Sequence, residues 1–152
     1  MSNDTIIAAL KPVLAHLKAL DLADTQTARE SLAQQFPPGG ELFSALRALA
    51  DSGLREGWLC GREAGPSRFS RVAKPEKGDG YSIDAVLLWG DGPKHKHLKG
   101  EVNCMLALEG APKFCGFEPG WAVFAPGSAH VPSVQGGKML IFYMLPDGAV
   151  EW

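Results

Sequence analysis

The sequence predicts a mainly β protein that begins with an α-helical region. In the first third of the chain, apolar residues recur at three- and four-residue steps, as expected of amphipathic helices that bury one face. After Gly53, glycine or proline recurs every several residues between short β-branched or aromatic runs, which is typical of a small sandwich or barrel. We therefore expect a helical region over residues 1–55 and a β-barrel over residues 56–152.

Three helices are predicted in the N-terminal region. The first carries a stripe of isoleucine, leucine and valine, and Pro12 inside that stripe could kink it. Gly53 is suited to the left-handed conformation that follows a helix, so it is expected to end the third. The region would pack against the β part or form a subunit contact, and a homodimer is the expected assembly. The expected bounds are Asp4–Leu20, the segment between the Asp24 N-cap and Pro37, and Glu41–Ser52.

Seven strands are predicted in the rest of the chain. Each is a short run of apolar, β-branched or aromatic residues that ends at glycine, proline or a polar cluster. The expected strands are Gly57–Cys60, Arg68–Ala73, Tyr81–Trp89, Glu101–Leu108, Trp121–Phe124, His130–Val134 and Lys138–Leu145.

The composition indicates an ordinary globular chain without a strong charge bias. It has 152 residues, 45% of them hydrophobic, and 15 Lys and Arg against 17 Asp and Glu give a formal net charge of -2. Nucleic acids and anionic membranes are recognised through dense positive charge, so neither is an expected partner. The three cysteines form no CxxC pair, and the sequence has neither a signal-like start nor an apolar run of about 20 residues. We therefore expect a cytoplasmic protein.

Three histidines and one glutamate form the candidate site. In an extended strand alternate residues share a face, so His95 and His97 can direct two imidazoles to one point. Glu101 would return to the same face if Gly100 does not break the strand, and His130 would arrive from another strand. Divalent metals bind these donor types, so we predict that the metal ligands are His95, His97, Glu101 and His130.

A structural role is the alternative for this set. The His-x-His pattern alone is a weak signal that occurs on many exposed strands. A metal site is favoured because a glutamate and a turn-borne histidine accompany the His-x-His pattern. The sequence holds only one further histidine, His16, which is expected on a helix without a partner. Iron, manganese, zinc and nickel all accept such ligands, so the identity of the divalent metal ion stays open.

The two histidine-bearing segments resemble the motifs of the cupin superfamily. The segment Gly92–Glu101, closing at Gly110, is similar to the first cupin motif, and Gly120–His130 is similar to the second. The resemblance implies a cupin-like antiparallel β-barrel (jelly roll) in which two histidines and a glutamate from the first motif and a histidine from the second bind a metal. The sequence departs from the usual pattern in its longer glutamate-to-glycine spacing and in Val134, which stands where an asparagine is usual.

A closer resemblance covers most of the β region. The run Ser67–Pro75, the segment Tyr81–Val86 and the tail Met139–Trp152 are similar, together with both motifs, to the 4-hydroxylaminobenzoate lyase family of small cupin proteins. The resemblance implies a metal-dependent lyase that converts 4-hydroxylaminobenzoate to 3,4-dihydroxybenzoate (protocatechuate) and ammonia during the degradation of nitroaromatics. Two alternatives stay open: a cupin dioxygenase acting on an aromatic acid, and a cupin that binds a small acid without turnover.

A small aromatic carboxylate as substrate requires a cation and an apolar slot, because a buried carboxylate without a partner is costly. Arg68 and Arg71 are the candidate cations. Their odd separation directs them to opposite faces of a strand, and we favour Arg71.

Strand parity indicates further candidate residues of the pocket. Asn103 shares the face of Glu101 and could donate a hydrogen bond to the substrate, whereas Cys104 should point away from it. Tyr143 and Trp121 are candidate ring or hydroxyl partners, although packing in the core is the alternative for both. The predicted catalytic residues are Glu101, Arg71, Asn103 and Tyr143.

Overall fold

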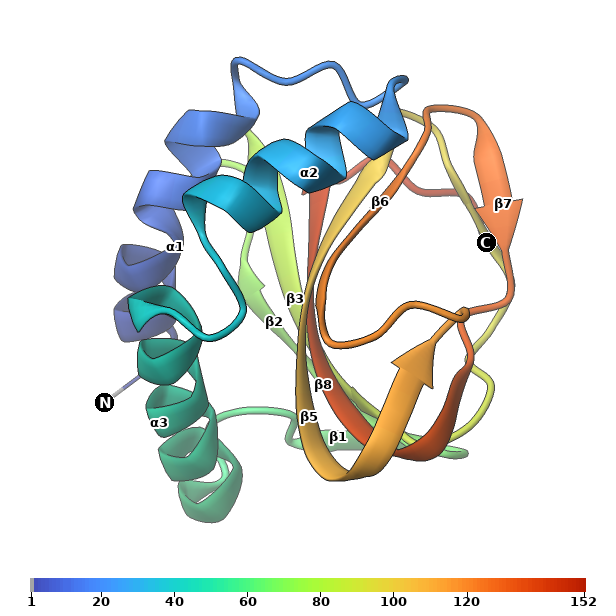
Figure 1. The fold of residues 1–152 in the computed structure, drawn as a ribbon. Coiled ribbons are helices and arrows are strands. Elements are labelled where there is room, and N and C mark those ends of the chain that lie inside the picture. The colour runs from blue at the N-terminus through green and yellow to red at the C-terminus, as the bar shows by residue number, and fades with distance from the viewer. Residues whose placement is uncertain (1) are drawn as a thin grey trace.

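Three helices precede an antiparallel β region in the computed structural model, which describes residues 2–152 (Figure 1). The helices are α1 (Asn3–Leu17), α2 (Thr25–Gln35) and α3 (Glu41–Glu56). The strands are β1 (Arg62–Ala64), β2 (Ser67–Ala73), β3 (Tyr81–Leu88), β4 (His95–His97), β5 (Glu101–Phe114), β6 (Gly120–Phe124), β7 (Ser128–His130) and β8 (Val134–Pro146).

The first helix follows its sequence signals closely. Ser2 is the N-cap of α1 and forms a capping box with Thr5, which satisfies two backbone N–H groups at the start of the helix. The helix continues through Pro12 and buries one apolar face. It ends at Leu17 rather than at Leu20, because the chain turns there to reach α2. Among residues 2–152, no helix is both long and apolar enough to cross a membrane.

The end of the third helix differs from the prediction. Gly53 lies inside α3, and the helix instead ends at Gly57, whose φ of 87° is left-handed. A side chain at Gly53 would lie only 2.7 Å from Leu59, so this glycine permits close packing rather than helix termination. The strand expected at Gly57–Cys60 is therefore wrong: these residues form the turn that brings Leu59 back onto the helix.

Two antiparallel sheets form the β region. The larger has the strand order β1-β2-β3-β8-β5-β6, and the smaller consists of β4 and β7. In the part of the chain that the structure describes, no strand joins the two sheets into a closed barrel, so the fold is a cupin-like open sandwich. The strand expected at His130–Val134 is wrong, because Pro132, which has no N–H to donate, separates β7 from β8.

The two faces of the larger sheet have different neighbours. Figure 1 shows α1 and α3 on one side of this sheet and β7 on the other. Val102, Cys104 and Leu106 pack into the core with the helices, whereas Met105 and Tyr143 pack on the opposite, inner face. The inner face is therefore the face that the smaller sheet covers, and Cys104 points away from it, as strand parity predicted.

Trp121 belongs to the helical side of the sheet. Its indole N–H donates to the Phe36 carbonyl oxygen at 2.9 Å, and its ring meets Phe43 edge to face at a centroid distance of 5.6 Å. The hypothesis that Trp121 contacts the substrate is therefore wrong, and its role is to attach the helices to β6.

Candidate metal centre

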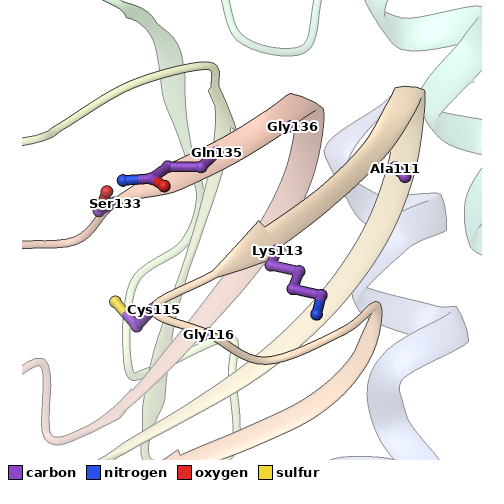
Figure 2. Close-up of a pocket in the computed structure, with 7 residues that line it drawn as sticks. All are labelled: Ala111, Lys113, Cys115, Gly116, Ser133, Gln135 and Gly136. Atoms are coloured by element: carbon purple, nitrogen blue, oxygen red, sulfur yellow. The ribbon is translucent and has the colours of Figure 1, made fainter.

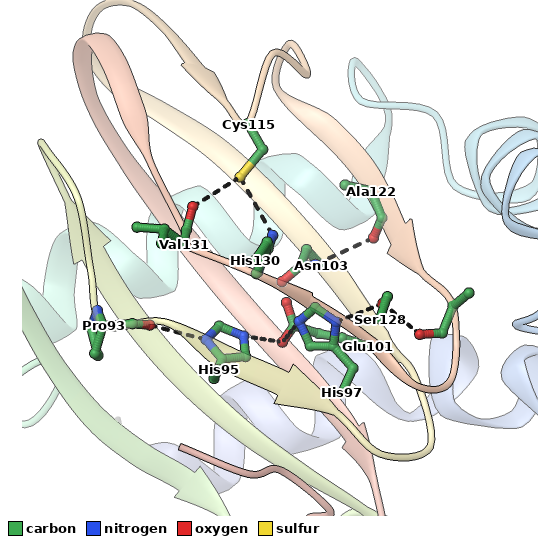
Figure 3. A network of polar contacts seen from close by, with 11 residues as sticks. Pro93, His95, His97, Glu101, Asn103, Cys115, Ala122, Ser128, His130 and Val131 are labelled. Atoms are coloured by element: carbon green, nitrogen blue, oxygen red, sulfur yellow. Dashed lines mark hydrogen bonds and ion pairs between the residues drawn. The ribbon is translucent and has the colours of Figure 1, made fainter.

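Four side chains from both sheets converge on one point. His95 and His97 lie on β4, and His130 is the register partner of His95 on β7. Glu101 begins β5 in the larger sheet. One donor atom from each of these four residues lies within 4.8 Å of the others. Figure 3 shows the imidazoles of His95 and His97 directed at the Glu101 carboxylate.

Glu101 reaches this point by a different route from the one predicted. β4 ends at His97, and Gly100, with a φ of 96°, completes the turn that leads the chain into β5. The carboxylate therefore faces His95 and His97 from the opposing sheet instead of following them along one strand. A side chain at Gly100 would approach the Phe124 carbonyl oxygen to 3.1 Å, which further favours glycine here.

The ligand atoms are buried and only partly hydrogen-bonded. His97 is 0% and Glu101 1% exposed. Glu101 Oε2 lies 3.0 Å from His95 Nε2 and 3.2 Å from His97 Nε2, but the latter contact lacks hydrogen-bond geometry. Within residues 2–152, no partner satisfies His97 Nε2, Glu101 Oε1 or His130 Nε2. Because buried polar atoms are rarely left without partners, this pattern fits a site for a cation.

A second set of contacts orients the three imidazoles. His95 Nδ1 lies 3.3 Å from the Pro93 carbonyl oxygen, His97 Nδ1 lies 2.9 Å from Ser128 Oγ, and His130 Nδ1 lies 3.6 Å from Cys115 Sγ. Figure 3 shows these contacts on the outer side of the cluster. The Nδ1 atom of each ring thus contacts a neighbouring residue, and the Nε2 atom is directed at the centre of the cluster. Histidine ligands in protein metal sites are oriented in the same way.

The electrostatics of the cluster favour a charged glutamate. Burial raises the pKa of Glu101, but the contacts with His95 and His97 outweigh burial and bring its pKa down to about 2. Burial lowers the pKa of His95, yet the Glu101 carboxylate raises it above the usual value. Burial lowers the pKa of His130 to about 4. The glutamate is therefore anionic and His130 neutral near pH 7, which are the protonation states that bind divalent metals.

Aromatic rings enclose the cluster. Phe124 stacks on His97 at a centroid distance of 5.3 Å, and Phe114 meets His130 edge to face at 5.9 Å. These rings keep water from one side of the ligands, which strengthens electrostatic interactions at the centre.

Polar side chains extend from the cluster across the floor of the larger sheet. The register pairs Arg71 with Asp84, Asp84 with Tyr143 and Tyr143 with Asn103, so all four lie in one row on the inner face. Arg71 Nε lies 2.6 Å from Asp84 Oδ1. Arg68 instead pairs with Leu87, whose side chain packs on the helical side, so the two arginines occupy opposite faces as predicted.

Asp84 is a member of this row that the sequence prediction missed. Burial raises the pKa of its carboxyl, although Arg71 opposes this shift. The available signal was a carboxylate between the apolar residues Ile83 and Ala85 of β3, because a charge in a largely buried strand requires a partner.

A surface pocket of about 550 Å³ lies near the cluster without including its ligands (Figure 2). Cys115 contributes to this pocket and also contacts His130, so the thiol connects the two features. Burial raises the pKa of Cys115, which keeps the thiol protonated near pH 7. The pocket is lined by Ala111, Lys113, Cys115, Gly116, Ser133, Gln135 and Gly136.

His16 lies outside the site. It has partners after all, because its Nε2 lies 2.9 Å from Ser31 Oγ and its ring meets Phe36 edge to face. These contacts connect α1 to α2, so the residue has the structural role that the sequence favoured.

An antiparallel sandwich with a His3Glu cluster between its sheets defines a cupin protein. A model of the family described as "PnbB: 4-hydroxylaminobenzoate lyase" matches residues 9–152. The chain belongs to this family, and it is a lyase-like enzyme.

Two curated relatives match nearly the whole chain, and both are named 4-hydroxylaminobenzoate lyase. The relative from Nocardioides sp. (strain LMS-CY) is 33% identical over 97% of this chain and 92% of its own length. The relative from Pseudomonas putida is 29% identical over 99% of this chain and 95% of its own length.

Similarity to solved structures is more distant. An RmlC-like cupin protein from Ralstonia eutropha JMP134 is 12% identical with a TM-score of 0.41, covering 55% of this chain and 57% of that chain. Salicylate 1,2-dioxygenase from Pseudoaminobacter salicylatoxidans is 17% identical with a TM-score of 0.41, covering 70% of this chain and 32% of that chain. The family assignment rests on the sequence relatives.

Proposed function

We propose that this protein is a metal-dependent lyase that converts 4-hydroxylaminobenzoate to 3,4-dihydroxybenzoate (protocatechuate) and ammonia. The observation that carries the proposal is the buried His3Glu cluster with unsatisfied donor atoms at its centre. The names of the two curated relatives support the choice of substrate.

His95, His97, Glu101 and His130 would hold a divalent iron, manganese, zinc or nickel ion. Bound there, such an ion supplies Lewis-acid polarisation of the hydroxylamine oxygen of the substrate. Glu101 has a second role as a fixed negative charge, since its contacts with His95 and His97 keep it ionised.

The overall reaction balances without a redox partner. Adding one water to the hydroxylamino acid gives the dihydroxy acid and ammonia, so no external oxidant or reductant is consumed. In the scheme we favour, the N–O bond breaks, water adds to the electron-poor ring, and a second water hydrolyses the resulting ring imine with release of ammonia. The hydroxyl that departs from nitrogen takes up a proton and leaves as water.

The polar row on the sheet floor would position the substrate. Arg71 would bind the substrate carboxylate, since it presents a guanidinium on the inner face beside Asp84. Asn103 is fully buried, its Oδ1 has no partner within residues 2–152, and its Nδ2 makes only a 3.5 Å contact, so its amide could bond to the substrate. Tyr143 would act as a neutral hydroxyl donor, because burial raises its pKa well above the usual value.

We further propose a cytoplasmic homodimer in which residues 1–55 form the helical region and residues 56–152 the β region of one folding unit. The single folding unit is supported by a shared core, because Leu10 and Leu32 of the helices belong to the same apolar cluster as Cys104 of the sheet. Light scattering of the purified protein tests the dimer, and a single mass of one chain would contradict it.

Turnover under nitrogen in ¹⁸O-labelled water tests the function. We expect metal-loaded protein to form 3,4-dihydroxybenzoate and ammonia in equal amounts, with both ring oxygens labelled from water. A requirement for dioxygen, with label arriving from ¹⁸O₂ gas, would instead indicate a cupin dioxygenase. Stoichiometric metal without conversion of an aromatic hydroxylamine would indicate a cupin that only binds a small acid.

A further inference from the structure

Trp152 lies beside the metal-ligand cluster although it belongs to neither sheet. Its ring centroid is 5.4 Å from that of His95, at an interplanar angle of 57°. The preceding residue, Glu151, exchanges two backbone hydrogen bonds with Lys96 at 2.7 and 3.0 Å. The end of the described chain is therefore attached to β4 as a short antiparallel neighbour.

The backbone pairing fixes the face on which Trp152 lies. Lys96 is exposed and lies between two buried histidines of β4. Residues opposite one another on antiparallel strands share a face, so Glu151 lies on the outer face with Lys96. The next pair places Trp152 with His95 on the inner face, which agrees with the short distance between their rings.

The indole is largely open to solvent despite this position. Trp152 is 78% exposed, which is unusual for a large apolar ring held by backbone hydrogen bonds next to a buried cluster. An exposed aromatic ring beside a buried ligand cluster is the arrangement expected where an apolar ligand binds.

We propose that Trp152 is a substrate-positioning residue whose indole stacks on the aromatic ring of the substrate and thereby selects aromatic over aliphatic acids. The proposal rests on the proposed function for the reacting groups, which would face the four ligands. Stacking against an indole accepts a planar ring and favours it over a puckered ring of the same size, because only the planar ring makes close contact over its whole face.

A pair of unreactive ligands tests this inference on the intact protein. 4-Aminobenzoate and trans-4-hydroxycyclohexanecarboxylate each carry one carboxylate and one polar para substituent that is uncharged near pH 7, and they differ chiefly in ring planarity. Calorimetric titration of metal-loaded protein should show that Trp152→Ala binds 4-aminobenzoate about tenfold more weakly than the unchanged protein, whereas Trp152→Phe stays within about threefold. Binding of the cyclohexane acid should change little in either variant.

Two controls separate stacking from damage to the site. Trp89→Phe alters an indole that contacts Lys138, and it should leave both affinities unchanged. Elemental analysis should give the same metal content for all variants, because Trp152 supplies no ligand atom. Unchanged affinity of Trp152→Ala for 4-aminobenzoate, equal losses for both acids, or no binding of 4-aminobenzoate by the unchanged protein would overturn the inference.

The outcome is independent of the proposed reaction. If the protein fails to convert 4-hydroxylaminobenzoate yet Trp152→Ala selectively weakens 4-aminobenzoate binding, the stacking role stands and the lyase proposal fails. If turnover occurs and the Trp152 variants bind as the unchanged protein does, only the stacking role fails.

Discussion

Ser128 Oγ and His97 Nδ1 lie 2.9 Å apart across the smaller sheet. The Ser128 hydroxyl also donates to the Ala125 carbonyl oxygen at 2.6 Å, which uses its single proton. Its oxygen must therefore accept from His97, so the imidazole proton resides on Nδ1. The lone pair of His97 Nε2 is consequently directed at the centre of the cluster, in the tautomer that a metal ligand requires.

Replacing Ser128 with alanine should weaken metal binding. Without the hydroxyl, His97 loses its orienting partner and its preferred tautomer, so we expect the metal affinity to fall about 10- to 100-fold. Competition with a chromophoric chelator measures this change. Ser31→Ala is the matched control, because Ser31 contacts His16 outside the site; equal affinities for the Ser128 and Ser31 variants would contradict the tautomer argument.

Replacing Arg71 with alanine should raise the KM for 4-hydroxylaminobenzoate about tenfold and change kcat less. A charge-assisted bond to the substrate carboxylate would be lost, and its contribution is reduced because the side chain is half exposed. Steady-state kinetics provide the measurement. Arg68→Ala serves as the control, since Arg68 lies on the other face of the same strand; a larger effect of Arg68→Ala than of Arg71→Ala would refute the assignment.

Asp84 should make stability depend on pH. Burial raises the pKa of this carboxyl in the folded protein above the value of 3.8 expected for the unfolded chain, so the folded state binds the proton more tightly. Stability from this group therefore increases as the pH falls from neutrality through the raised pKa towards 3.8, by at most about 1.4 kcal/mol per pH unit.

Urea unfolding of the unchanged protein and of Asp84→Asn between pH 7 and pH 4 checks this sign. We expect the stability difference to shift in favour of the unchanged protein as the pH falls. A shift in the opposite direction would mean that Arg71, not burial, dominates the environment of Asp84.

Trp121→Phe should affect stability and leave the metal site intact. The change removes the indole donor and leaves the partly buried Phe36 carbonyl without this partner, at a cost of about 1–2 kcal/mol. Thermal unfolding measures the loss. Reduced metal content with normal stability would contradict the placement of Trp121 on the helical side of the sheet.

Local patterns predicted the helices and the members of the cluster well. Asp24 and the Pro37-Pro38 pair mark helix boundaries through backbone chemistry that acts within a few residues. The types and spacing of His95 and His97 likewise indicated one shared face, which β4 confirms.

Features that depend on contacts between distant segments were not predictable in the same way. Glu101 joins the histidines from the opposing sheet because the chain turns at Gly100. The alternation of side chains along a single strand does not predict that the carboxylate comes from another sheet. Gly53 has a sequence context typical of a helix end, yet packing against Leu59 decides its place inside α3. Trp152 reaches His95 only through its backbone pairing with β4, which no local pattern encodes.

Elemental analysis of protein saturated with divalent ions and then desalted shows whether the His3Glu cluster holds a metal ion. We predict about one metal ion per chain for the unchanged protein and for His16→Ala, and at least a tenfold lower content for His97→Ala and for His97→Gln, which retains a polar side chain of similar length. No retained metal in the unchanged protein, or equal metal in the His97 variants, would mean that these four side chains do not form a metal site.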